Sequence, residues 1–190
     1  MIHNFKDVLK HKTVLFKYLN EIKKINLFNE LGVSVYSPKE ALICLKNKNI
    51  KHIQIPFNIL DQRWLKTNFL KQLKSRPDVK IHARSIFLRG LILNRFKYWP
   101  IWLKNRAKII ENLEFLRKKF KMVNRLQLCL SYVKAFNWIN FIIIGVDNLS
   151  QLKDIAKMKK KKELSNLQKT LIISKMKNLA TDRLVKPYRW

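Results

Sequence analysis

The feature that most constrains the fold of this chain is a repeated alternation of short apolar runs with helix-length stretches. The runs are rich in aliphatic and β-branched residues, and each ends at a polar break. They lie at residues 31–37, 52–58, 79–85 and 140–146. Strands that are apolar along nearly their whole length are typical of a parallel sheet covered by helices, and the segments between them are long enough for crossover connections. We therefore expect an α/β fold.

Helix signals fall between these runs. Residues 11–28 carry an apolar stripe at helical spacing, Ser37-Pro38 opens a second helix, and Asn148 with Gln151 three residues later resembles a further helix start. The tail from residue 163 contains one more amphipathic helix. Residues 89–106 are aromatic and irregular, and they predict a long loop over the strand ends.

The charge of the chain leaves two explanations open. Lys and Arg number 41 against 12 for Asp and Glu, which gives a net charge of +29. Such an excess is typical of proteins that bind nucleic acid or another polyanion. The chain is also rich in Lys, Asn and Ile with only 3 Gly, as an AT-rich genome would impose. The basic residues are spread along the chain with one dense cluster at 157–163, so we favour coding bias, with polyanion affinity as a side effect.

No run approaches the roughly 20 apolar residues that a membrane helix needs, and the N-terminus lacks the apolar region of a signal peptide. Cys44 and Cys129 are isolated and lack metal-ligand spacing, so we expect two free core thiols in a reducing cytoplasm. No catalytic triad, P-loop or metal site is supported, and we expect His52 and His82 to serve packing.

Polar residues recur where the predicted strands end. They are Ser34, Gln54, Arg84 with Ser85, and Asp147 with Asn148. Ligands of parallel sheets bind at the carboxyl ends of the strands, so these side chains predict a binding site at that edge.

Taken in order, five segments resemble the aldo/keto reductases, in particular the bacterial branch linked to surface-sugar biosynthesis. They are GVSVYSPKEA, IQIPFNILDQRW, HARSIFLRGLIL, FIIIGVDNLSQLKDI and the closing LVKPYRW. The resemblance implies a partial (β/α)8 TIM-type barrel, comprising strands 4/5 to 8 with their helices. Residues 1–190 would then form a single C-terminal half of such a barrel, with NADP (or NAD) as the cofactor.

The resemblance also assigns candidate cofactor residues. Ser34 and Gln54 match the positions that hold the nicotinamide carboxamide, and their hydroxyl and amide supply suitable donors and acceptors. Arg84, Ser85 and Phe87 lie in the segment that runs under the nicotinamide ring and along the pyrophosphate. The last strand and helix start, which take the adenosine phosphate, are matched by Gly145, Val146, Asp147, Asn148 and Gln151.

This sequence departs from the family pattern at several positions. Val35 replaces the usual Asn, Arg84 replaces a stacking aromatic residue, and Arg89 replaces Gln. Met1-Ile2-His3-Asn4 resembles the tail of the fourth strand, which makes His3 the counterpart of the catalytic His. The catalytic Asp, Tyr and Lys of the family would lie in strands that precede Met1.

The expected function is therefore that of an aldo/keto reductase-like NAD(P)-dependent oxidoreductase in which most of the catalytic tetrad is missing, so that the chain alone turns over little or nothing. An open half-barrel leaves strand edges unpaired. We expect the isolated chain to aggregate or to find a partner that supplies the missing strands. The alternatives are a non-enzymatic protein that binds nucleic acid or another polyanion, and the remnant of a broken gene.

Overall fold

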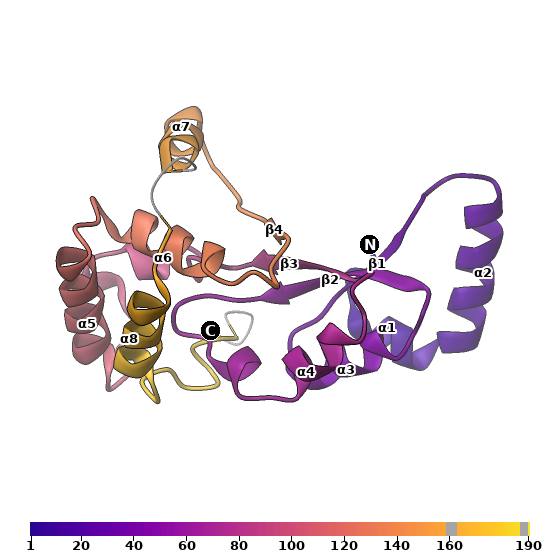
Figure 1. The fold of residues 1–190 in the computed structure, drawn as a ribbon, viewed down its shortest axis with the longest axis horizontal. Helices are drawn as coiled ribbons and strands as arrows, with labels where there is room; N and C mark the ends of the chain where they lie inside the picture. Colours follow the sequence, from indigo (N-terminus) through magenta and orange to yellow (C-terminus); the bar gives the residue numbers. More distant parts are fainter. Residues whose placement is uncertain (159–162, 187–189) are drawn as a thin grey trace. The chain divides into compact units, whose positions relative to one another are not determined.

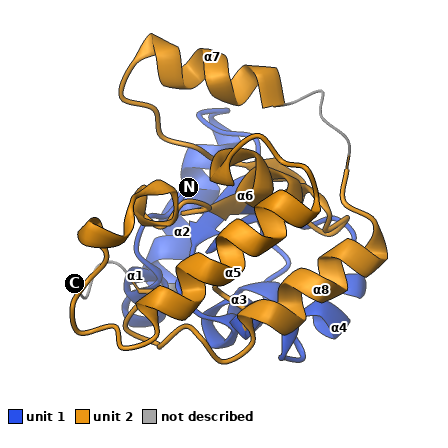
Figure 2. Ribbon diagram, turned by 90° about the vertical axis from the view of Figure 1, so that its left-hand side faces the viewer, with its two compact units in different colours: residues 1–56, 63–82 blue, residues 57–62, 83–190 orange. Residues whose placement is uncertain are grey.

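A computed structural model of the chain describes residues 1–158, 163–186 and 190. The chain divides into two compact units (Figure 2). Unit 1 comprises residues 1–56 and 63–82, and unit 2 comprises residues 57–62 and the described residues from 83 onward. Most of the basic cluster at 157–163 and part of the closing LVKPYRW segment lie outside the described residues.

The strands follow the predicted apolar runs. They are β1 (Leu31–Ser34), β2 (Ile50–Pro56), β3 (Lys80–Arg84) and β4 (Phe141–Ile142), and they form one sheet in the order β1-β2-β3-β4. The β1–β2 pair is parallel, as expected, and all four residues of β1 are buried. β4 is shorter than the run at 140–146, and it stands at the end of the strand order.

The N-terminus continues the sheet beyond β1. The Ile2 N–H donates to the Gly32 carbonyl at 2.7 Å, and the Ser34 N–H donates to the Ile2 carbonyl at 2.8 Å. These bonds form a parallel bridge between Ile2 and Val33. They agree with the expectation that residues 1–4 resemble the tail of a strand.

Gly32 is required where β1 meets β2. A Cβ at position 32 would lie 2.8 Å from the Cβ of His52, its partner in the parallel register. Real Cβ atoms do not approach one another so closely, so only glycine lets the two strands pair here.

Unit 1 surrounds its strands with short helices. They are α1 (Phe5–Lys10), α2 (Lys12–Lys24), α3 (Pro38–Leu45), a 3-10 turn (Arg63–Leu65) and α4 (Phe69–Lys74). Helix α3 begins as predicted, because Ser37 Oγ accepts a bond from the Glu40 N–H and Pro38 occupies its first turn. Helices α3 and α4 pack against each other (Figure 1).

Helix α2 is amphipathic, but it buries none of the side chains described in it. Val14 and Tyr18 are 73% and 64% exposed, and Ile25 and Leu27 just beyond the helix are about as exposed. An apolar stripe of this kind normally packs against a neighbour. The face of α2 is therefore a surface without a partner among the described residues.

Unit 2 is mainly helical. Its elements are α5 (Arg106–Lys119), α6 (Arg125–Lys134), α7 (Leu149–Met158), α8 (Asn166–Met176) and two 3-10 turns (Leu91–Leu93 and Phe96–Tyr98). Helix α5 packs against α6 and α8. Helix α8 confirms that a helix follows residue 163, although its apolar residues do not form one well-defined face. The two short turns confirm that residues 89–106 form an irregular connection.

The core of unit 2 is aromatic. Phe57 stacks on Tyr132 at a ring distance of 5.8 Å and makes edge contacts with Phe136 and Trp138. Such pairs add about 0.5–1.5 kcal/mol each beyond the area that they bury. Phe57 follows directly on β2, so this cluster anchors the segment 57–62 in unit 2.

Both cysteines are free and buried, as expected. Burial raises the pKa of the Cys44 thiol and of the Cys129 thiol to about 12. Within the described part of the chain, every helix is too short or too polar to span a lipid bilayer.

Arg76 joins separate segments of unit 1. Its side chain is only 15% exposed, and its guanidinium donates to the carbonyls of Leu45, Asn47 and Ile50. Two further bonds, at 2.9 and 3.0 Å, reach the Asp78 carboxylate, and they hold the pKa of Asp78 well below its usual range. The end of α3, the start of β2 and the turn before β3 thus meet at one side chain.

We predict that Arg76→Met lowers the free energy of unfolding by about 2 kcal/mol, because it leaves partly buried carbonyls without donors. Urea denaturation followed by circular dichroism measures this loss. Arg95→Met is the matched control, because Arg95 is exposed and its side chain forms no hydrogen bond within the described part of the chain. Equal losses in the two variants would contradict the role of Arg76.

Candidate functional site

The backbone that leaves β3 is strained. Ser85, Leu88 and Arg89 have φ values of 57°, 48° and 53°, and Gly90 has 81°. A non-glycine residue at positive φ is uncommon, and three of them in five residues must be stabilised by their surroundings. Ile86 and Leu88, at most 1% exposed, anchor the loop in the core.

Asn58 helps to hold this loop. Its side chain is fully buried, and its Nδ2 donates to the Ser85 carbonyl at 3.3 Å. Its Oδ1 accepts bonds from the N–H groups of Leu60 and Asp61 at 3.0 and 3.1 Å. The polar break after β2 therefore shapes the end of β3, a role that the sequence did not predict for Asn58.

The turn after β4 is held by its own side chains. Asn148 Oδ1 accepts a bond from the Gln151 N–H at 2.9 Å, which confirms the predicted helix start. Gln151 Oε1 in turn accepts a bond from the Asp147 N–H at 2.9 Å. This exchange orders residues 147–151 at the beginning of α7.

These two loops line one pocket of about 530 Å3 within unit 2. Six of the predicted cofactor residues lie on its wall: Arg84, Ser85, Phe87, Gly145, Asp147 and Gln151. Val146 and Asn148 do not line it. The sequence missed Leu126, from the first turn of α6, because nothing in the sequence links that helix to the strand ends.

Arg84 and Arg89 give the pocket its positive charge. Arg84 donates to the Ser85 hydroxyl at 3.3 Å, while Arg89 is exposed and forms no hydrogen bond among the described residues. The apolar part of the pocket wall includes Leu93, Ile143 and Ile155. A cavity with apolar walls and a few fixed polar groups is typical of a small-molecule site.

In unit 1, Ser34 and Gln54 face each other across β1 and β2. Their residues are paired in the parallel register, and Ser34 Oγ donates to Gln54 Oε1 at 3.1 Å. Ser34 is 3% exposed and Gln54 is partly exposed. The Gln54 NH2 group remains available as a donor to a ligand.

His3 is exposed and follows Ile2, whose carbonyl accepts the Ser34 N–H bond. The backbone therefore places His3 beside the end of β1 at which Ser34 lies. No hydrogen bond joins the His3 side chain to Ser34 or Gln54 in the described chain.

His52 and His82 form a chain of contacts in unit 1. His52 Nδ1 lies 2.8 Å from His82 Nε2, and His52 Nε2 lies 2.6 Å from the Glu30 carboxylate. Glu30 and His82 contact opposite nitrogens of the His52 ring, so the three groups do not converge on one ion, and no metal-binding group of three His, Cys, Asp or Glu residues occurs among the described residues. Burial and the neighbouring His52 both lower the pKa of His82.

We predict that the free energy of unfolding falls as the pH is lowered from about 7 to 5. A His whose pKa is lowered by folding binds protons more readily in the unfolded chain, so its contribution is present above about pH 6.5 and lost below it. Urea denaturation at three pH values measures the slope. His82→Gln is expected to flatten it, whereas His11→Gln, at an exposed position, is not. An unchanged slope in the His82 variant would contradict this assignment.

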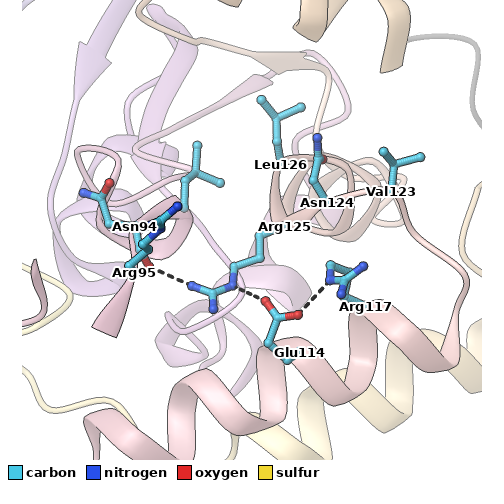
Figure 3. Close-up of a pocket in the computed structure, with 9 residues that line it drawn as sticks. Asn94, Arg95, Glu114, Arg117, Val123, Asn124, Arg125 and Leu126 are labelled. Atoms are coloured by element: carbon cyan, nitrogen blue, oxygen red, sulfur yellow. Dashed lines mark hydrogen bonds and ion pairs between the residues drawn. The ribbon is translucent and has the colours of Figure 1, made fainter. Parts of the chain in front are cut away.

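A second pocket, of about 420 Å3, is built around Glu114 (Figure 3). Arg117 and Arg125 donate to its two carboxylate oxygens at 2.8 and 2.7 Å. Burial by itself would raise the pKa of Glu114, but the two arginines outweigh it and hold this pKa below its usual value. Arg125 also donates to the carbonyls of Ile92 and Asn94, so the cluster fixes the connection after β3 to α5 and α6.

No protein-family model and no curated protein sequence matches this chain. Solved structures do match. The apo and holo forms of aldo-keto reductase AKR11C1 from Bacillus halodurans superpose with a TM-score of 0.66, at 21% and 20% identity. The glycerol dehydrogenase AKR11B4 from Gluconobacter oxydans superposes with a TM-score of 0.64 at 18% identity.

The chain has the fold of part of an aldo/keto reductase. The two forms of AKR11C1 match 87% of this chain and AKR11B4 matches 83%. The matched part makes up 57%, 56% and 52% of the three structures, in the same order. The fold class expected from the motifs, a partial (β/α)8 barrel, is confirmed.

Proposed function

We propose that this chain is the cofactor-binding half of an aldo/keto reductase-like, NAD(P)-dependent oxidoreductase. The observation that carries the proposal is the pocket of about 530 Å3, which gathers residues from the loops after β3 and β4. Six of its lining residues are those that the family resemblance assigns to a nicotinamide dinucleotide. The fold itself is that of aldo-keto reductases, one of which is known in a holo form.

The residues present suit such a cofactor. Arg84 and Arg89 offer positive charge to its pyrophosphate, and the ordered turn at the start of α7 offers polar groups to the adenosine ribose. In unit 1, the Gln54 NH2 group and the Ser34 hydroxyl suit the nicotinamide carboxamide. When bound, the nicotinamide supplies or accepts a hydride.

His3 is the one catalytic candidate that the resemblance assigns within these residues. Tyr36 and Tyr98 match no catalytic motif of the family, so a proton donor for the substrate oxygen is lacking here. We propose that turnover, with a carbonyl compound as substrate, requires the first strand–helix units of the barrel, which these residues do not include.

The exposed apolar face of α2 supports a contact with these units. Val14 and Tyr18 lie on it, and Leu9 in α1 is also 56% exposed. Somewhat less than half of each solved relative has no counterpart here. A strand–helix unit of the missing half would cover this face and pair with the sheet beside Ile2.

We predict that the chain binds NADH saturably. The binding is measured by energy transfer from protein tryptophan to the nicotinamide. Arg89→Gln is expected to weaken binding by up to about fivefold, because an exposed charge pair contributes up to about 1 kcal/mol. Arg95→Gln removes the same charge from the same unit but lies outside this pocket, and it is expected to leave binding unchanged.

Duplex DNA serves as the competitor in the same titration. If DNA displaces NADH and the two variants weaken binding equally, the chain is a polyanion-binding protein, and the proposed function is wrong.

We predict that the chain alone self-associates as its concentration rises, so that the titrations use dilute protein, and that co-expression with the N-terminal strand–helix units of an aldo/keto reductase yields a soluble complex on size-exclusion chromatography. Val14→Asp with Tyr18→Asp is expected to weaken the complex at least tenfold, since both changes place charge on the apolar face. Thr13→Asp with Lys17→Asp, at exposed positions of the same helix, is the control. A monodisperse monomer that unfolds cooperatively and does not bind the N-terminal units would contradict this proposal.

A further inference from the structure

The turn that begins α7 differs in charge from the rest of the chain. Lys and Arg number 41 of 190 residues, yet the seven residues from Gly145 to Gln151 contain neither. They contain one carboxylate, that of Asp147, which lines the pocket between Gly145 and Gln151. Asp147 therefore places a negative charge on the wall of the dinucleotide pocket, although the protein as a whole is strongly basic.

Gln151 fixes the position of Asp147. Its Oε1 accepts the Asp147 N–H bond at 2.9 Å, and its Nε2 donates to Asp147 Oδ2 at 3.4 Å. Asp147 Oδ1 takes part in neither bond. Lys157, on the same helix, lies 3.7 Å from Asp154 instead, and Asp147 forms no ion pair with any described Lys or Arg. One oxygen of this carboxylate therefore remains available to a ligand.

The two cations of the pocket come from the other loop. Arg84 and Arg89 belong to the segment that leaves β3, whereas Asp147 follows β4. The wall formed by the β3 loop thus suits a pyrophosphate, and the wall at the start of α7 suits a group that donates hydrogen bonds.

NAD and NADP differ at one position of the adenosine ribose. NAD carries a 2′-hydroxyl there, which donates a bond to a carboxylate, and NADP carries a phosphate, which a carboxylate repels. We propose that Asp147 makes this pocket select NAD(H) over NADP(H). The inference rests on the proposed function, in which the residues from Gly145 to Gln151 receive the adenosine ribose. The family resemblance put NADP before NAD as the expected cofactor, and this inference puts NAD first.

The test is a set of binding titrations of the full chain with NADH and NADPH, at low and at physiological salt. Wild-type protein is expected to bind NADH about tenfold more tightly than NADPH, since juxtaposed like charges reduce affinity strongly. Asp147→Asn keeps the shape of the side chain at an exposed position and removes the charge. This variant is expected to remove most of the difference between the NADH and NADPH affinities, mainly by tightening the binding of NADPH.

Glu111→Gln is the matched control, because it removes one negative charge from an exposed position of unit 2 that does not line the pocket. It is expected to leave the ratio of the two affinities unchanged. Equal or tighter binding of NADPH to the wild type, or a ratio that shifts equally in both variants, would overturn the selection by Asp147 while leaving the proposed function in place. If neither dinucleotide binds, the proposed function fails, and this inference fails with it.

Discussion

The parallel pairing of β1 with β2 is the constraint on which the candidate site in unit 1 depends. Its register sets Gly32 against His52 and Ser34 against Gln54. A slip by one residue would turn every side chain of β1 to the opposite face of the sheet, and the bond between Ser34 and Gln54 would be lost. Gly32 permits this register, because any larger residue would collide with His52.

In unit 2, the pocket depends on order in two irregular loops. The loop after β3 keeps an unfavourable backbone because Ile86 and Leu88 are packed in the core and Asn58 holds the Ser85 carbonyl. The turn after β4 is ordered by Asn148 and Gln151. One wall is therefore stabilised by packing and the other by local hydrogen bonds, and the charges on the two walls are opposite.

Much of this arrangement follows from local sequence. The order of strands and helices, the caps at Ser37 and Asn148, and the burial of both cysteines were predicted from patterns within a few residues. The rule that the carboxyl ends of parallel strands meet at one edge predicted Arg84, Ser85 and Asp147 of the pocket. The family resemblance added Phe87, Gly145 and Gln151.

The contacts that local sequence did not predict join distant residues. Arg76 reaches carbonyls about 30 positions away, His52 meets His82 across two strands, and Glu114 of α5 pairs with Arg125 of α6. Each depends on how segments pack, and no spacing rule indicates it. The positive φ angles of Leu88 and Arg89 were equally hidden, since neither residue type favours that conformation.

The burial of both cysteines has a practical consequence. With pKa values near 12, almost none of either thiol is ionised at neutral pH, and the thiolate is the form that reacts with alkylating reagents. The native chain is therefore silent toward maleimide dyes while it stays folded. A single cysteine introduced on α2 or α7 would be the one labelled position, so a fluorophore could report on either helix without first removing Cys44 or Cys129.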